Sequence, residues 1–248
     1  MYQGIQTIKE AKSARSRPYA QNTLRDFVKE LKPFTEEDFR AMIGACTNSR
    51  KRALLSILFE GGPRIRELAR LRWVGVEIED EYGGITFLDS KTKRKWYVCV
   101  TLGREYLVRW RVDYPFDPDE PWAYVFVSSR LDPDAYPALR IALETIRKRS
   151  GVSKSIHPHL FRKSKIIDMV RKGYQDSIIK EAMWGNKNTN KLETYMVLAK
   201  MYIQEEFLDR AGIKKKAQAE PVLQAHQCPR CYTVWPPTDR YYSKCGIS

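Results

Sequence analysis

The sequence lacks long apolar runs. No stretch of its 248 residues approaches the roughly 20 apolar residues that span a bilayer, and the start MYQGIQTIKEAKSARSR lacks the apolar segment of a signal peptide. A cytoplasmic protein that does not bind membranes is therefore expected. The sequence also contains no glycine-rich phosphate-binding loop and no core cluster of carboxylates suited to a metal ion. No cofactor is expected for any chemistry in the core.

Cysteine is scarce and odd in number, which argues against a disulfide framework. Of the five cysteines, Cys46 and Cys99 have apolar neighbours in the sequence, which favours reduced and buried thiols. Cys228, Cys231 and Cys245 are all close to the C-terminal end. That spacing indicates metal binding before disulfide formation.

Acidic residues are the minority charge. Lysine and arginine outnumber aspartate and glutamate by 44 to 30, which gives a formal net charge of +14 and a pI near 9.5. A polyanionic partner is favoured, with DNA or RNA first. The alternative is a solvated basic surface without a nucleic-acid partner, and charge alone does not choose between them.

The first predicted elements are helices. Thr35 precedes Asp38 by three residues, a capping pattern that opens a helix. A second apolar helix covers 50–60 and ends at the turn GGP. The segment RIRELARLRW predicts a third helix over 64–73, because its apolar residues recur about one turn apart.

A different pattern follows between 74 and 102. Three short β-type runs, VEI, ITFL and WYVCVTL, are separated by EDEYGG and by the basic segment DSKTKRK, which predicts an antiparallel meander. Helical patterns then resume to the end of the main domain, over 104–112, 134–150, 159–173, 176–185 and 192–212, where Gly212 forms the C-cap.

These patterns predict a mainly α fold with one small antiparallel β-sheet, in the α+β class. With 43% hydrophobic residues the chain can bury one substantial core and add a small module. We expect a basic N-terminal arm over 1–33, a main domain over 34–213, and a linker with a small C-terminal tail over 214–248.

Three segments place unusual polar residues beside apolar helix faces. Arg64 follows the GGP turn with Glu67 one turn later, His159 and Arg162 are three residues apart, and Tyr195 lies in the apolar segment TYMVLAKMY. Each has a plain alternative: a surface ion pair, an unrelated pair of basic residues, and a core tyrosine. Only their combination is specific.

In this order the segments resemble the tyrosine recombinases of the phage integrase family. The resemblance covers Thr35 to Gly212 and implies the catalytic-domain fold of that family. Its motifs match Gly62-x-Arg64-Ile65-x-Glu67-Leu68, a hairpin lysine at Lys91 with Lys93 as the second choice, His159-x-x-Arg162, and a nucleophile at Tyr195. Segments such as YLVRWRVDYP and CPRC suggest the archaeal chromosomal, plasmid or viral branch.

The sequence departs from the family pattern nine positions before Tyr195. Most members have Gly-His or Gly-Trp there, whereas this chain has Gly185-Asn186. An asparagine can donate a hydrogen bond to a phosphate oxygen but lacks the charge of an imidazolium, and Trp184 could substitute in part. This departure implies weaker catalysis than the full family pattern would give.

The resemblance implies a reaction that suits these residue types. Tyr195 would attack a phosphodiester of double-stranded DNA and form a 3′-phosphotyrosine, while Arg64, His159, Arg162 and Asn186 hold the phosphate. Lys91 would be the general acid, and Glu67 would orient Arg64. The residues expected to contact DNA are Lys93, Arg94, Lys95, Lys163 and Lys165.

The family resemblance also implies a homotetramer assembled on recombining DNA. A rival interpretation is a DNA-binding regulator or architectural protein that keeps the fold without useful catalysis. Asn186 and the lack of a full N-terminal clamp domain favour the rival, whereas the complete set of matched motif residues favours the enzyme. A third interpretation is relaxation of supercoils as a side activity of the same cleavage and religation.

The C-terminal segment HQCPRCYTVWPPTDRYYSKCG resembles a zinc ribbon. Cys228 and Cys231 form a CxxC knuckle, and Cys245 resembles the end of a second one in which Tyr242 stands where a cysteine is expected. His226 could complete a tetrahedral site, although its position two residues before a knuckle is strained for a ligand. A structural zinc site and a decayed knuckle without metal both remain open.

Overall fold

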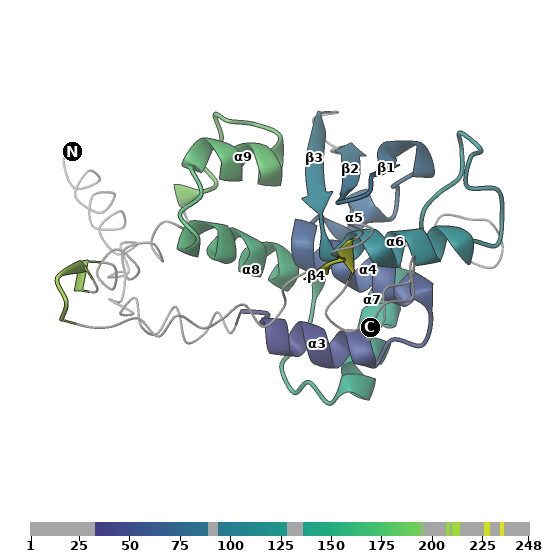
Figure 1. Cartoon of the computed structure of the whole chain (residues 1–248), viewed down its shortest axis with the longest axis horizontal. Helices are drawn as coiled ribbons and strands as arrows, with labels where there is room; N and C mark the ends of the chain where they lie inside the picture. Colours follow the sequence, from purple (N-terminus) through teal and green to yellow (C-terminus); the bar gives the residue numbers. More distant parts are fainter. Residues whose placement is uncertain are drawn as a thin grey trace, which may run out of the picture. The chain divides into compact units, whose positions relative to one another are not determined.

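The computed structural model shows a helical domain that carries one small sheet (Figure 1). The chain divides into two units, Met1–Lys32 and Pro33–Ser248, and every described residue belongs to the second. The described residues are 33–88, 94–127, 136–193, 195, 207–208, 210–213, 226–228 and 234–235. Their elements are α3 (Glu36–Gly44), α4 (Ser49–Gly61), α5 (Ile65–Leu68), the 3-10 turn η1 (Trp73–Gly75), β1 (Val76–Ile78), β2 (Gly83–Leu88), β3 (Lys95–Val100), α6 (Leu102–Val112), α7 (Tyr136–Ser150), α8 (Pro158–Arg171), α9 (Asp176–Trp184), β4 (His226–Gln227) and β5 (Val234–Trp235).

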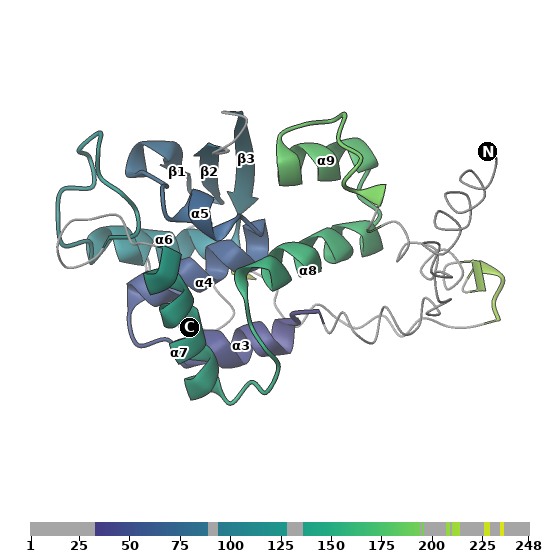
Figure 2. The same ribbon diagram turned by 180° about the vertical axis from the view of Figure 1, so that it is seen from behind.

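Helix α4 is the centre of the main core. It contacts α3, α6, α8 and β3, and both Figure 1 and Figure 2 show it among these elements. The helix begins at Asn48, whose side chain accepts a hydrogen bond from the backbone N–H of Lys51 at 2.9 Å. Gly61 near its end packs on β3 so closely that a Cβ there would lie 2.7 Å from a methyl group of Val98. The sheet and the helices therefore share one core.

Helix α3 begins as the sequence predicts. The Thr35 hydroxyl accepts from the backbone N–H of Asp38, and the Asp38 carboxylate accepts from the backbone N–H of Thr35 at 2.8 Å. This reciprocal capping box satisfies two N–H groups that the first turn leaves without helical partners.

The predicted meander is present as the antiparallel sheet β1-β2-β3. Ile85 of β2 pairs with Val76 on one side and with Val98 on the other, and all three side chains are buried. Alternate residues of β3 face the core, which buries Trp96 and exposes Cys99. The expectation of a buried Cys99 was therefore wrong, because the period of the strand turns it outward, whereas Cys46 is buried as predicted.

The helix predicted over 64–73 is much shorter. Helix α5 ends at Leu68, because the following backbone pairs with another part of the chain. The N–H of Val125 donates to the Leu71 carbonyl at 2.8 Å, and the N–H of Trp73 donates to the Ala123 carbonyl at 2.9 Å. These long-range hydrogen bonds compete with the helical ones and are invisible in a local pattern.

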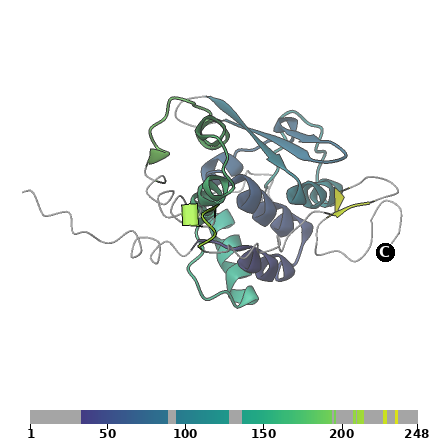
Figure 3. The same ribbon diagram turned by 60° about the vertical axis from the view of Figure 1, so that its left-hand side comes forward.

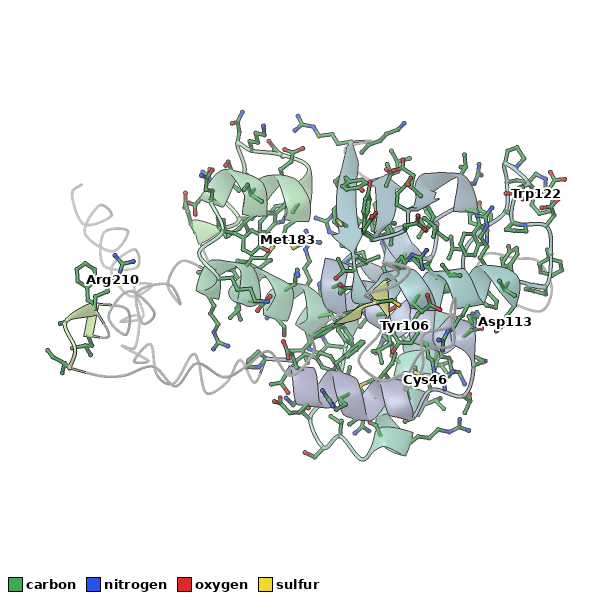
Figure 4. The ribbon with its side chains drawn as sticks, viewed as in Figure 1. Cys46, Tyr106, Asp113, Trp122, Met183 and Arg210 are labelled. Atoms are coloured by element: carbon green, nitrogen blue, oxygen red, sulfur yellow. The ribbon has the colours of Figure 1, made fainter. Side chains whose placement is uncertain are left out.

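Helices α8 and α9 enclose a second, smaller core. It contains Ile166, Met169, Ile179, Met183 and Leu192. Figure 3 shows the two helices nearly end-on with the sheet at their side, and Figure 4 places Met183 between α9 and α8. Helix α9 also contacts β3, so its last turn lies where the two cores meet.

Some predicted elements fall partly or wholly outside the described residues. Of the helix expected over 192–212, the described positions 193, 195, 207–208 and 210 are helical, and Gly212 has a φ of +69°. The arm over 1–32 and the hairpin tip over 89–93 are not described. None of the described helices combines the length and the apolar character that a membrane span requires.

Candidate active site

The turn after α4 brings the start of α5 against α8. Gly62 ends α4 with a φ of +57°, a conformation that favours glycine. A Cβ at Gly62 would lie only 3.1 Å from the Cα of Arg162. The absence of a side chain lets this turn touch the backbone of α8, and Arg64 enters α5 two residues later.

Glu67 holds both the backbone and the side chain of Arg64. Its carboxylate accepts from the Arg64 backbone N–H at 3.0 Å and from the guanidinium Nη1 at 2.5 Å. The Glu67 side chain is 1% exposed, whereas that of Arg64 is 31% exposed. The pair is thus more than the surface ion pair of the plain alternative: a buried anion orients a cation that reaches the surface.

Arg162 is a buried cation held by main-chain carbonyls. The residue is 6% exposed. Its Nη1 donates to the Gly62 carbonyl at 3.0 Å, and its Nη2 donates to the Met183 carbonyl in the last turn of α9. Carbonyls at helix C-termini carry partial negative charge, which suits a guanidinium. Arg162 therefore connects α8 to the ends of α4 and α9.

Two tryptophans lie next to Arg162. Its guanidinium carbon is over the ring of Trp96 from β3 and over the ring of Trp184 from α9. Trp96 is a neighbour that the motifs did not reveal. The alternation in KWYVCV does predict an inward-facing side chain at Trp96, but its contact with α8 depends on the tertiary fold.

Tyr195 lies half-buried against the end of α9. Its ring centroid is 6.4 Å from that of Trp184, and the side chain packs against the smaller core. Burial raises the pKa of Tyr195, and the positive charge of Arg162 opposes that rise. The phenol is therefore neutral near neutral pH, and the charge of Arg162 favours its ionised form.

His159 belongs to the same helix as Arg162, and Asn186 follows the helix that ends with Trp184. His159 is exposed one turn before Arg162 on α8. Asn186 is half-buried directly after Gly185, which ends α9, and its Oδ1 accepts from the backbone N–H of Asn188 at 3.1 Å. The amide nitrogen is then the end of Asn186 that can donate to a ligand.

The predicted DNA-contacting cations divide into two groups. Arg94, Lys95 and Lys163 are exposed, the first two at the start of β3 and the third on α8. Lys165 is half-buried near Glu60: burial raises the pKa of Glu60, and the charge of Lys165 is among the groups that oppose the rise. The hairpin residues Lys91 and Lys93 lie outside the described residues.

The tail contributes one short hairpin. Strands β4 and β5 pair antiparallel, with His226 opposite Trp235. Cys228 is buried directly after β4, while Cys231 and Cys245 lie outside the described residues. Within the described ranges, no three histidine, cysteine or acidic residues are placed to hold a metal ion.

Comparison with known proteins identifies relatives of this arrangement. Transposase A from transposon Tn554 of Staphylococcus aureus is 23% identical over 218 residues, covering 79% of this chain and 58% of the relative. Tyrosine recombinase XerC of Xylella fastidiosa (strain 9a5c) is 29% identical over 116 residues, covering 46% of this chain and 37% of the relative. The chain therefore spans well under two thirds of the length of these relatives.

The fold has a relative among solved structures. The crystal structure of XerA recombinase superposes with a TM-score of 0.58 at 20% identity, covering 71% of this chain and 64% of that one. Residues 32–201 also match the sequence pattern of the phage integrase family, which is well over half of the chain. With this match, the chain belongs to the phage integrase family.

Proposed function

We propose that this chain is a site-specific recombinase that cleaves and rejoins double-stranded DNA, with Tyr195 as the nucleophile. The observation that carries the proposal is the position of Arg162. This buried cation bonds to the turn that leads into Arg64 and lies close enough to Tyr195 to influence its pKa. These two contacts support a single site built from the turn before Arg64, Arg162 and Tyr195 in this member of the phage integrase family.

Each residue has a role in the proposed reaction. Arg64 and Arg162 stabilise the extra negative charge on the nonbridging oxygens as the Tyr195 oxygen attacks phosphorus. Glu67 orients Arg64, and His159 and Asn186 add hydrogen bonds to the phosphate. Lys91 on the hairpin protonates the departing 5′-oxygen. The 3′-phosphotyrosine retains the energy of the broken bond, so rejoining needs no nucleotide cofactor.

The proposed partners are double-stranded DNA and three further copies of the chain. Recombination joins two DNA duplexes with two strands each, and one nucleophile per strand requires four protomers. The exposed cations Arg94, Lys95 and Lys163, together with Lys93 and Lys165, support contact with DNA phosphates. The protein then acts at DNA in the cytoplasm. Membership of the archaeal branch stays a prediction from sequence segments.

The rival function is a DNA-binding regulator with weak or no cleavage. Two observations favour it: Asn186 stands where the family has histidine or tryptophan, and burial leaves the pKa of Tyr195 above its ordinary value. Both lower the expected rate without removing the nucleophile. A regulator and an enzyme make opposite predictions for covalent attachment to DNA.

Covalent attachment tests the proposal directly. A duplex that the wild-type chain binds, selected from a random-sequence library and nicked near the bound site, is incubated with protein and run on a denaturing gel. Wild type should give a protein–DNA adduct, and Tyr195→Phe should give none. Tyr174→Phe, at an exposed tyrosine between α8 and α9, is the matched control and should react like wild type. An equal adduct with Tyr195→Phe would refute the assignment.

A structural zinc ion in the tail is a separate proposal. Cys228 follows β4 and Cys231 lies in the β4–β5 connection, as in a CxxC knuckle on a hairpin. Cys245 and His226 would complete the ligand set. Metal analysis of purified protein should find about one zinc per chain, and none would leave a decayed knuckle as the explanation.

A further inference from the structure

Two tryptophan rings lie against the guanidinium of Arg162. Its guanidinium carbon lies 5.7 Å from the ring centroid of Trp96 and 5.4 Å from that of Trp184. Tryptophan attracts a cation more strongly than the other aromatic residues do, and the attraction increases where water is excluded. A residue that is 6% exposed meets that condition.

Trp96 is itself fixed on both sides. Its ring stacks on Phe87 with centroids 4.8 Å apart. Gly185 has a φ of +58°, and a Cβ there would lie 3.0 Å from the Cβ of Trp96 and 3.1 Å from the carbonyl oxygen of Lys95. The end of α9 is thus packed directly on β3, which brings Trp184 and Trp96 to the same guanidinium.

The indole N–H of Trp96 does not explain why tryptophan is used. The residue is 3% exposed, and its Nε1 has no hydrogen-bond partner in the part of the chain that the structure describes. A buried donor without a partner is unfavourable, and phenylalanine would avoid it. What tryptophan adds at this position is its larger and more electron-rich ring face, which is turned to Arg162.

We propose that Trp96 and Trp184 are positioning residues that hold the Arg162 guanidinium for the scissile phosphate. The carbonyls of Gly62 and Met183 hold its N–H groups, and the two rings restrict the position of its carbon. The inference rests on the proposed function but has a test that needs no DNA.

The first test measures how firmly Arg162 is held. Side-chain signals of ¹⁵N-arginine are recorded by NMR and assigned with Arg162→Lys, for wild type and for the double variant Trp96→Phe/Trp184→Phe. Wild type should show slowly exchanging Arg162 N–H groups, and the folded double variant should exchange at least about tenfold faster. Unchanged Arg162 exchange in the folded double variant would overturn the proposal.

A matched control exists in the same chain. Trp73 is buried and has the guanidinium carbon of Arg111 over its ring at 5.3 Å, outside the candidate site. Trp73→Phe should alter the Arg111 signals and leave those of Arg162 as in wild type. This variant separates loss of a particular ring–cation contact from general loosening of the core.

The second test separates positioning from folding during cleavage. Single-turnover cleavage is measured on the selected duplex with a natural scissile phosphate and with a neutral methylphosphonate. Trp96→Phe and Trp184→Phe should each slow cleavage of the natural substrate about fivefold, with DNA affinity unchanged. On the methylphosphonate the difference from wild type should disappear, because there is less charge for Arg162 to stabilise. Equal slowing on both substrates would overturn the proposal.

The two tests fail separately from the proposed function. If wild type forms no adduct with any duplex, recombination is refuted, yet the exchange measurement still decides whether the rings hold Arg162. If wild type cleaves DNA and Trp96→Phe and Trp184→Phe cleave it as fast as wild type does, the proposed function stands and the positioning role is refuted.

Discussion

Two arginine–glutamate pairs at the same spacing show how burial determines what a residue does. Arg64–Glu67 and Glu144–Arg147 are both three residues apart, with closest contacts of 2.5 and 2.6 Å. Glu144 is 45% exposed, so solvent screens its pair, while the Glu67 carboxylate is nearly inaccessible. Only the buried carboxylate also fixes a backbone N–H. Glu67 therefore sets the position of its arginine.

Glu67→Gln should impair both stability and cleavage. Glutamine keeps a hydrogen-bond acceptor but removes the buried charge that pairs with Arg64, which should cost about 2 kcal/mol of unfolding free energy. Adduct formation should slow at least about tenfold, because Arg64 loses its fixed orientation. Urea unfolding and the denaturing gel measure the two effects.

The exposed pair supplies the comparison. Glu144→Gln should leave the unfolding midpoint and the cleavage rate nearly unchanged, since the Glu144 carboxylate on α7 is open to solvent and fixes no backbone N–H. If the two glutamate variants behave alike, the difference in burial has no functional meaning and Glu67 is not a positioning residue.

At the scale of elements, local patterns predicted what local interactions decide. The capping box at Thr35, the αL glycine after α4 and the alternation of β3 involve neighbours a few residues apart, so they could be predicted from sequence. The early end of α5 could not, because it depends on the hydrogen bonds Trp73–Ala123 and Leu71–Val125, which join distant parts of the sequence. The expectation of a buried Cys99 was wrong for a local reason: it relied on apolar neighbours in the sequence, whereas the two-residue period of the strand decides which side chains face the core.

The candidate site divides in the same way. Its motif residues Arg64, Glu67, Arg162 and Tyr195 were identified by spacing and resemblance. The fold places Arg162 against the turn that precedes Arg64 and near enough to Tyr195 to affect its pKa. Sequence reasoning could not identify the carbonyls of Gly62 and Met183, because a backbone carbonyl has no sequence signature. It also could not identify the ring of Trp96, whose position in the strand pattern is that of an ordinary core residue. Tertiary contacts alone show that these groups surround one guanidinium.

Adding one methyl group to Gly62, in the turn between α4 and α5, should disturb the contact of this turn with α8. Gly62→Ala places a Cβ 3.1 Å from the Cα of Arg162 in a left-handed conformation. The conformation alone should cost about 1–2 kcal/mol of stability, and the backbone contact should add to it. Cleavage should fall further than stability explains, because the Gly62 carbonyl that holds Arg162 is displaced.

Gly151 isolates the conformational part of that cost. It has a φ of +73°, yet nothing lies within 4 Å of the position of its Cβ. Gly151→Ala should therefore show only the backbone penalty in urea unfolding and should cleave DNA at the wild-type rate. Equal cleavage by both alanine variants would mean that the turn does not position Arg162.

The stability of the first turn of α8 should depend on pH. His157 is its N-cap, and its Nδ1 accepts from the backbone N–H of Leu160 at 3.2 Å, which requires the neutral ring. Partial burial lowers the pKa of His157 below 6.5, and the nearby positive groups His159, Lys163 and Arg140 lower it further. The unfolded chain therefore binds this proton at higher pH than the folded one, so stability falls as the pH drops.

His157→Asn should remove that pH dependence. Asparagine caps helices well and does not titrate in this range. Unfolding free energies of the two proteins should be similar at about pH 7.5, and the variant should gain on wild type as the pH falls towards about 5. A constant difference across this range would show that another group causes the acid sensitivity.

For the whole molecule, the excess of positive charge should appear as salt-dependent binding. The net charge is +14, and exposed lysines occur near the site on β3 and α8. Each cation that contacts a DNA phosphate releases condensed counterions, so the logarithm of the affinity falls with the logarithm of the salt concentration. The number of contacts sets the slope, whereas a solvated basic face would leave the slope unchanged when one of its charges is removed.

Lys95→Ala/Lys163→Ala distinguishes these two uses of charge. If both lysines contact phosphates, the slope measured by fluorescence anisotropy between about 50 and 200 mM salt should decrease by about 2. Lys172→Ala removes one charge from the opposite end of α8, where Lys172 pairs with Asp168 at 3.0 Å, and should leave the slope as in wild type. If wild type and both variants have the same slope, the DNA binds elsewhere on the chain. If the slope decreases by the same amount per removed charge in both variants, net charge alone attracts the DNA. Only a decrease specific to Lys95 and Lys163 would place the duplex over the start of β3 and the start of α8, beside the candidate site.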